Sequence, residues 1–175
     1  MMTGLFEKIA ELLLNVPPFI MVFPDEGGVF LRLGKYKKTI GCGFHWKWPI
    51  FDRIEKIPVK MQEVNLVNQR IMRRDGKCLG VSGIIRYEVK DAQKAILEVQ
   101  DYDTAMCNLA LRTIANYVSL IATEECTPAK IEEVVLNDLQ GEAEGWGIDV
   151  LDFGLSDFVT MKVIGLMGDP PNIKD

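Results

Sequence analysis

The feature that most constrains the fold is a change in the spacing of apolar residues near position 90. From Phe19 to Val89 apolar and polar residues mostly alternate, which is the period of a β-strand. After Asp91 the apolar residues recur every three or four positions, as they do along one face of a helix. The later segment IDVLDFGLSDFVTMKVI (148–164) returns to strand spacing. Strands, then helices, then one more strand predict an α+β fold in which the last strand rejoins the sheet.

The stretch GGVFLRLGKY (27–36) predicts one strand with apolar side chains on one side. Val29, Leu31 and Leu33 would share that side, and the two glycines at the start would supply a turn. The following stretch, TIGCGFHWKWP, is rich in glycine and aromatic residues. It indicates a tight turn and a short strand that stops at Pro49.

The stretch DRIEKIPVKMQEVNLVNQR (52–70) predicts one or two further strands. Its apolar register shifts, as it would at a bulge near Gln62-Glu63, and Pro58 indicates a sheet edge or a strand break. The clearest local pattern is Asp75-Gly76, which predicts a two-residue hairpin turn with flanking strands. The strand after this turn places five apolar residues on one side: Leu79, Val81, Ile85, Tyr87 and Val89.

Three helices are predicted from the residues at their N-termini. Asp91 and Asp101 precede the first two helical stretches, and Thr127 precedes the third, with a proline at its first position. Gly145 and Gly147 are expected to close the third helix. One apolar face of that helix is formed by Ile131, Val134, Val135, Leu139, Ala143 and Trp146.

The N-terminal segment 1–23 is apolar and is interrupted by two adjacent prolines. A helix with a narrow polar arc is expected from Thr3 to about Val16. The uncharged run from Leu12 to Pro24 covers 13 residues, whereas a membrane-spanning helix needs about 20. A secretory signal is not expected here, because the segment has no basic start and no small-residue cleavage site.

Two interpretations of this segment stay open. It is either an interfacial helix followed by a shallow re-entrant loop, or a helix packed on the domain's own core. In the first case four or five side chains entering lipid, at ~1.5–3 kcal/mol each, would suffice for reversible membrane attachment. The candidate membrane contacts are Leu5, Phe6, Ile9, Leu12, Leu13, Val16, Pro17, Pro18, Phe19, Ile20, Met21 and Phe23.

The formal net charge of −5 hides an asymmetry between the two halves of the chain. Residues 1–90 carry 15 Lys or Arg and 9 Asp or Glu, whereas residues 91–175 carry 5 and 16. The basic half could meet anionic lipid headgroups, the two halves could meet head to tail between subunits, or the charges could serve solvation alone. A candidate headgroup or subunit contact flanks the predicted hairpin turn: Arg70, Arg73, Arg74 and Lys77.

No catalytic, metal or cofactor site is predicted. The four cysteines are far apart and form no C-x-x-C pair, so buried free thiols in a reducing compartment are expected. The single histidine, His45, is expected to be structural. GKYKKTIGCG lacks the order of a phosphate-binding loop, and Asp101 and Asp103 miss the calcium-loop pattern. Nucleic acid is not expected, because aromatic residues do not interleave with the basic cluster and the pI is about 5.0.

Three long stretches occur in an order that is typical of one known family. They are VFPDEGGVFLRLGKYKKTIGCGFHWKWPIFDRIEKIPVK, then VNQRIMRRDGKCLGVSGIIRYEVKDAQKAILEVQDYDTAMCNLALRTI, and finally WGIDVLDFGLSDF. The first resembles the opening of the SPFH or band-7 domain of stomatins, prohibitins and flotillins. The second is similar to that domain's hairpin, its strand-to-helix step and its next helix, and the third looks like its final strand. The resemblance covers about Val22 to Ile164.

The resemblance implies an SPFH-type domain over residues 24–165, between the apolar segment 1–23 and a polar tail at 166–175. Its N-terminal part (24–90) would hold a curved, mostly antiparallel sheet, and residues 91–165 would form a helix-rich lobe that ends in a strand. The family usually continues into a coiled coil, which this sequence does not include, so the size of any oligomer stays open.

The resemblance also implies a function without catalysis or a cofactor. Such a protein would be a membrane-associated scaffold that forms homo-oligomers, confines lipid microdomains and serves a membrane protease, channel or transporter. The bulk of the domain would lie on the cytoplasmic, reducing side. The alternative is a soluble adaptor that binds a protein partner through its apolar N-terminal helix.

Overall fold

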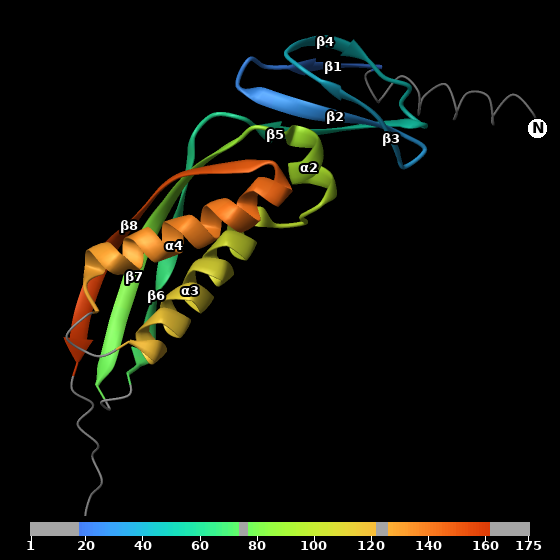
Figure 1. The fold of residues 1–175 in the computed structure, drawn as a ribbon. Coiled ribbons are helices and arrows are strands. Elements are labelled where there is room, and N and C mark those ends of the chain that lie inside the picture. The colour runs from blue at the N-terminus through green and yellow to red at the C-terminus, as the bar shows by residue number, and fades with distance from the viewer. Residues whose placement is uncertain (1–17, 74–76, 122–125, 162–175) are drawn as a thin grey trace, which may run out of the picture.

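The computed structural model describes residues 18–73, 77–121 and 126–161, which form a smaller and a larger lobe joined end to end (Figure 1). The smaller lobe contains two antiparallel sheets. In one, β1 (Phe19–Val22) pairs with β4 (Gly43–Trp46). In the other, β2 (Glu26–Arg32) lies between β3 (Lys35–Ile40) and β5 (Asp52–Pro58).

The larger lobe is a three-stranded antiparallel sheet covered by helices on one face (Figure 1). The central strand β7 (Cys78–Val89) pairs with β6 (Gln62–Met72) and with β8 (Ile148–Met161). The long helices α3 (Tyr102–Leu120) and α4 (Pro128–Ala143) pack on this sheet. The predicted α+β fold with a returning last strand is therefore confirmed.

Two short elements connect these parts. Helix α2 (Ala92–Leu97) follows β7 and contacts β2 and β5 of the smaller lobe. The 3₁₀ turn η1 (Glu144–Trp146) connects α4 to β8. Gly147 ends it in the left-handed region, with φ of 73°, and a β-carbon there would lie 2.7 Å from the Asp91 carbonyl oxygen. Glycine is thus required at this corner both by conformation and by space.

The hydrophobic core lies almost entirely in the larger lobe. The five residues predicted to share one side of β7 are all buried, and they meet the inner faces of α3 and α4. The smaller lobe has a separate, much smaller core of Val22, Phe30 and Ile40, against which Ile54 packs. Because burial of apolar surface is the main stabilising term, the larger lobe carries most of the stability.

The helix starts are as predicted. The Asp91 carboxylate accepts hydrogen bonds from the backbone N–H groups of Gln93 and Lys94, at 3.0 and 3.3 Å. The Asp101 carboxylate accepts one from the N–H of Thr104, at 3.1 Å. These bonds satisfy N–H groups that the first turn of a helix leaves without an intrahelical partner.

Two local predictions are wrong. The glycines at 27 and 28 do not form a turn: they lie inside β2, where a β-carbon on Gly28 would stand 2.9 Å from Cγ1 of Ile40. The chain turns instead at Leu33 and Gly34, which have positive φ angles of 52° and 76°. The single strand predicted over 27–36 is therefore divided between β2 and β3, and Leu33 is exposed in the turn. The bulge in β6 lies between Leu66 and Gln69, where the register with β7 shifts, and not near Gln62-Glu63.

Other predictions lie at or beyond the limits of the described residues. The strands of the predicted hairpin are present, and the N–H of Arg73 bonds to the carbonyl of Lys77 at 2.9 Å. The residues predicted to form the turn (74–76), the helix predicted from Thr3 to Val16 and the tail after residue 161 are outside the described residues.

Candidate functional site

The outer face of the sheet formed by β1 and β4 consists of large apolar side chains. In the register of these strands Phe19 stands opposite Trp46 and Met21 opposite Phe44, so that all four point to the same side. Between 47% and 63% of each residue is exposed, and the Phe19 and Phe44 rings lie 5.1 Å apart. We call these four residues the aromatic face. The alternate residue Val22 points inward and is buried in the small core.

A second group of exposed apolar residues lies at the connection between β4 and β5. Trp48, Ile50 and Phe51 are exposed there, and Leu33 in the turn between β2 and β3 is 72% exposed. Arg32, Leu33, Trp48 and Phe51 line an open hollow of about 380 Å³. The leucine is held in this place with positive φ, a conformation that non-glycine residues rarely adopt.

The carboxylate of Asp52 fixes this connection. It accepts hydrogen bonds from Nε and Nη2 of Arg32, at 2.7 and 3.0 Å, and from the backbone N–H of Trp48, at 2.9 Å. Its side chain is only 1% exposed. The hydrogen bonds from Arg32 lower the pKa of Asp52, burial opposes this shift, and the Trp48 N–H adds to it. Asp52 is therefore an ionised, fully bonded anchor of the loop that carries Trp48.

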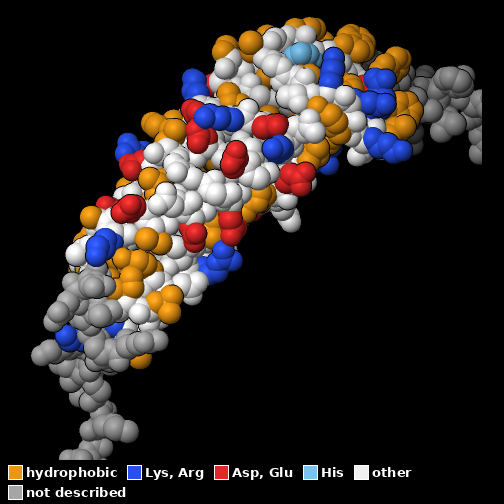
Figure 2. All heavy atoms as spheres, viewed as in Figure 1, with side chains coloured by type: hydrophobic (Ala, Val, Ile, Leu, Met, Phe, Trp, Pro, Cys, Tyr) orange, Lys and Arg blue, Asp and Glu red, His pale blue; other side chains and the backbone are white. Residues whose placement is uncertain are grey.

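The smaller lobe has an excess of uncompensated positive charge. Residues 18–60 contain eight Lys or Arg and four Asp or Glu. Each of the four acids forms an ion pair within the lobe: Arg32–Asp52, Arg53–Glu55, Lys56–Glu26 and Lys60–Asp25. Among the described residues, four lysines remain without an acidic partner: Lys35, Lys37, Lys38 and Lys47. Figure 2 shows hydrophobic and basic side chains gathered together over this lobe.

Several residues predicted to contact a membrane can be placed. Phe19 and Met21 belong to the aromatic face, and Phe23, the residue after β1, is exposed. Pro18 and Ile20 are half-buried. The earlier candidates, Leu5 to Pro17, lie outside the described residues. Five exposed apolar residues of this lobe were not predicted as contacts, although a dense run of aromatic residues from 44 to 51 indicates them: Phe44, Trp46, Trp48, Ile50 and Phe51.

The cations flanking the predicted hairpin turn lie elsewhere. Arg70 is exposed, Lys77 is half-buried and Arg73 is buried, while Arg74 is outside the described residues. Arg70, Arg73 and Lys77 stand where β6 ends and β7 begins, at the far end of the larger lobe from β1 and β4 (Figure 1). The structure thus does not bring these three cations and the aromatic face together.

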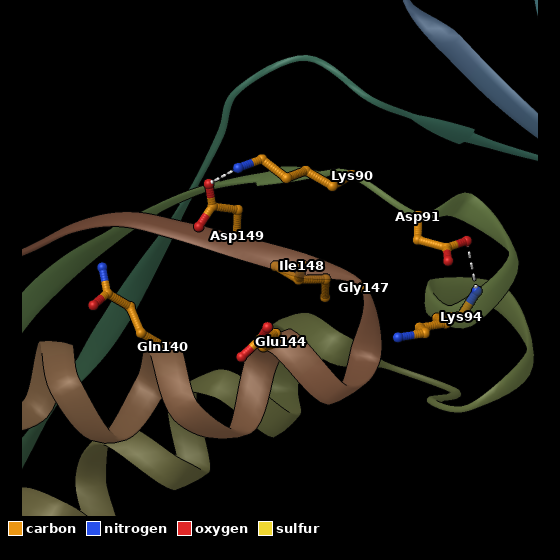
Figure 3. A pocket seen from close by; sticks show the side chains of 8 residues that line it. All are labelled: Lys90, Asp91, Lys94, Gln140, Glu144, Gly147, Ile148 and Asp149. Carbon is orange, nitrogen blue, oxygen red and sulfur yellow. Dashed lines mark hydrogen bonds and ion pairs between the residues drawn. The ribbon is translucent and has the colours of Figure 1, made fainter.

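A different hollow, of about 530 Å³, lies beside the joint of the two lobes (Figure 3). Two of the residues that line it, Lys90 and Asp149, form an ion pair, which raises the pKa of Lys90. The N–H groups of Lys90 and Asp91 both donate to the carbonyl of Gly147, at 3.0 Å. These bonds tie β7, α2 and β8 together, so this hollow has a structural explanation. Its lining residues are Lys90, Asp91, Lys94, Gln140, Glu144, Gly147, Ile148 and Asp149.

Over the described ranges, no three His, Cys, Asp or Glu side chains are grouped so that they could hold a metal ion. His45 is held by a hydrogen bond in which its Nε2 donates to the Gly41 carbonyl, at 2.9 Å. In the same ranges, no helix has both the length and the apolar character needed to cross a membrane.

Comparison with known proteins adds a family match. A model of the SPFH domain / Band 7 family matches residues 20–164. An uncharacterized protein of Methanocaldococcus jannaschii is 28% identical over 144 residues, which cover 81% of this chain and 72% of the relative. A putative band 7 family protein of Acanthamoeba polyphaga mimivirus is 21% identical over 144 residues, covering 81% of this chain and 48% of the relative.

An uncharacterized protein of Methanothermobacter thermautotrophicus is 28% identical over 152 residues, which cover 82% of this chain and 48% of the relative. The chain thus spans most of the first of these relatives and about half the length of the other two.

Proposed function

Because the chain belongs to the SPFH domain / Band 7 family, we propose that it is a non-enzymatic scaffold that rests on a membrane through its smaller lobe. In this role it assembles with further copies of itself and organises lipids or membrane-protein partners. The proposal assigns membrane contact to the aromatic face and to the apolar residues around it.

The observation that carries the proposal is the aromatic face with uncompensated lysines in the same lobe. Full burial of one large apolar side chain contributes ~1.5–3 kcal/mol. Since about half of each of the four side chains is still exposed, their transfer into lipid would contribute roughly 3–6 kcal/mol. Each lysine near an anionic surface adds ~1 kcal/mol. The combination suits the interfacial region, where tryptophan and cations are both favoured.

Chain connectivity also supports membrane contact through the smaller lobe. The apolar segment that precedes Pro18 enters the lobe directly at β1, the strand that contributes Phe19 and Met21 to the aromatic face. A segment dipping into one leaflet and a folded face resting on it would then reach the same bilayer surface.

Vesicle flotation tests the proposal. We expect the protein to float with vesicles of phosphatidylcholine and phosphatidylserine, and the double variant Phe44→Ser/Trp46→Ser to bind at least about thirtyfold more weakly, because ~2–4 kcal/mol of apolar transfer is lost. Leu120→Ser, which changes an exposed leucine at the end of α3 in the larger lobe, is the matched control and should float like the wild type.

If the wild type stays in solution with these vesicles, the membrane proposal fails and the adaptor alternative gains. Light scattering over a concentration series, with and without vesicles, tests assembly. A strict monomer under both conditions would contradict the scaffold role.

A further inference from the structure

An open hollow of about 530 Å³ lies beside the aromatic face and is lined by residues of β2, β3 and β4. It has basic and aromatic walls, and none of the described residues that line it is acidic. The lining residues are Phe30, Arg32, Lys37, Lys38, Phe44, His45 and Trp46. We propose that this hollow binds the phosphate of a lipid headgroup that carries a phosphomonoester. This inference rests on the proposed function and names the lipid chemistry that the smaller lobe would recognise.

Three cations converge on the hollow. Lys37 and Lys38 have no acidic partner among the described residues. Arg32 uses Nε and Nη2 to hold Asp52, which leaves its Nη1 group to donate to a ligand. The Arg32 guanidinium and the Lys38 ammonium lie 5.6 and 5.9 Å from the centre of the same Phe30 ring. Two cations near one ring repel each other and create a positive potential, so binding of an anion close to both would be favourable.

The walls of the hollow are fixed in place. Phe30 is buried in the small core, and Arg32 is held by its two bonds to Asp52. His45 is oriented by the bond from its Nε2 to the Gly41 carbonyl. Binding would therefore order mainly the two lysine side chains, which limits its entropic cost.

The neighbourhood of the hollow favours a lipid as the source of the phosphate. Phe44 and Trp46 line the hollow and also belong to the aromatic face. A phosphate in the hollow would thus stand at the edge of the surface that is proposed to rest on lipid. A phosphomonoester carries about −1.5 to −2 charges on three terminal oxygens, which matches three converging cations better than a phosphodiester does.

The test compares vesicles that differ in headgroup only. Phosphatidylcholine vesicles receive either phosphatidic acid or enough phosphatidylserine to match the surface charge. We expect the wild-type chain to bind the phosphatidic acid vesicles about tenfold more tightly. Lys37→Ala/Lys38→Ala should lose this preference and bind them roughly 25-fold more weakly, since ~1 kcal/mol per cation is about fivefold.

The matched control is Lys35→Ala/Lys130→Ala. It removes the same charge from exposed positions on β3 and α4, neither of which lines the hollow, and should keep the preference. All four lysines are exposed, so thermal melting should show that both variants fold like the wild type.

Four outcomes would overturn the inference. The first is equal binding of the wild type to both vesicle types, and the second is an equal loss of binding in the two double variants. The third is binding of inorganic phosphate or glycerol phosphate as tight as binding of the vesicles. The fourth is self-association that only Lys37→Ala/Lys38→Ala breaks, without any preference between the vesicles. If the protein still floats with phosphatidylserine vesicles when one of these outcomes is observed, the proposed function stands and only the phosphate inference fails. Failure to float with any vesicle removes the proposed function itself.

Discussion

Replacing Asp52 by asparagine should loosen the smaller lobe without disturbing the larger one. The carboxylate of Asp52 accepts two bonds from Arg32 and one from the Trp48 N–H while being almost fully buried. An asparagine side chain in its place would be neutral and would turn part of the acceptor capacity into N–H donors that face other donors.

The expected cost is about 2 kcal/mol. Removing one partner of a fully buried ion pair costs ~3–5 kcal/mol, and a hydrogen bond to a charged group contributes ~1.5–3 kcal/mol. The Arg32 side chain is about half exposed, so water replaces part of what it loses and the lower end applies. Because the smaller lobe has only a small core of its own, this loss should appear as local opening.

Hydrogen exchange followed by mass spectrometry measures this opening. Amides of β2, β5 and the connection at Trp48 should exchange about 30-fold faster in Asp52→Asn, which corresponds to ~2 kcal/mol. Amides of β7 and β8 should be unchanged. The control is Asp25→Asn, which removes a largely exposed pair with Lys60 at 3.7 Å in the same lobe and should have little effect.

The difference in exchange rate between the wild type and Asp52→Asn should also depend on pH. The pKa of Asp52 is lowered in the folded protein, so its stabilisation is fully present above the ordinary carboxyl pKa of about 4. It is lost as the pH falls through the lowered value, where wild type and variant should converge. Equal exchange in wild type and variant at neutral pH, or faster exchange throughout both lobes, would refute the role assigned to Asp52.

Of three further predictions, two concern backbone conformation and the third concerns a buried tyrosine hydroxyl. Leu33→Asn should raise the free energy of unfolding of the smaller lobe by about 0.5–1 kcal/mol, because asparagine tolerates positive φ better than leucine and the leucine side chain is exposed; a lower value in exchange measurements would contradict this. Gly147→Ala should cost at least about 2 kcal/mol in urea unfolding, whereas Gly141→Ala, in open space on α4, should stabilise by ~0.5–1 kcal/mol; similar effects of the two changes would count against the packing at Gly147. Tyr87→Phe should cost ~1–2 kcal/mol in the same assay, because the buried hydroxyl donates to Asp103; a variant as stable as the wild type would show that this bond contributes nothing net.

The sequence predicted those parts of the fold that local interactions determine. Asp91 and Asp101 cap helices through bonds to residues two or three positions away, and the inner face of β7 follows from simple alternation. The turn at Leu33 was not predictable in this way. Leucine rarely adopts positive φ, and the adjacent glycines at 27 and 28 offered a more ordinary turn. Their actual role, close packing against Ile40 and Val59, depends on chain segments far away in sequence.

Only part of the candidate site could be predicted, because the rest also depends on contacts between segments far apart in the sequence. Phe19 and Met21 were predicted as contacts, but their neighbours Trp46 and Phe44 reach them through pairing of β1 with β4, more than 20 residues later. The excess of positive charge in the N-terminal half could be counted from the sequence. Which cations remain uncompensated depends on ion pairs such as Arg32–Asp52, between residues 20 positions apart.

The pattern of charge also bears on the choice between a membrane and a protein partner. Protein interfaces tend to exclude lysine from their centre, and a protein partner presents charges of both signs. An anionic membrane presents negative headgroups above a hydrocarbon layer, which favours tryptophan and lysine together. In the described part of the smaller lobe, every carboxylate is engaged internally while four lysines and a face of four large apolar side chains stay open. This one-sided arrangement is what a lipid surface would select, and it is why we place the membrane interpretation ahead of the adaptor interpretation.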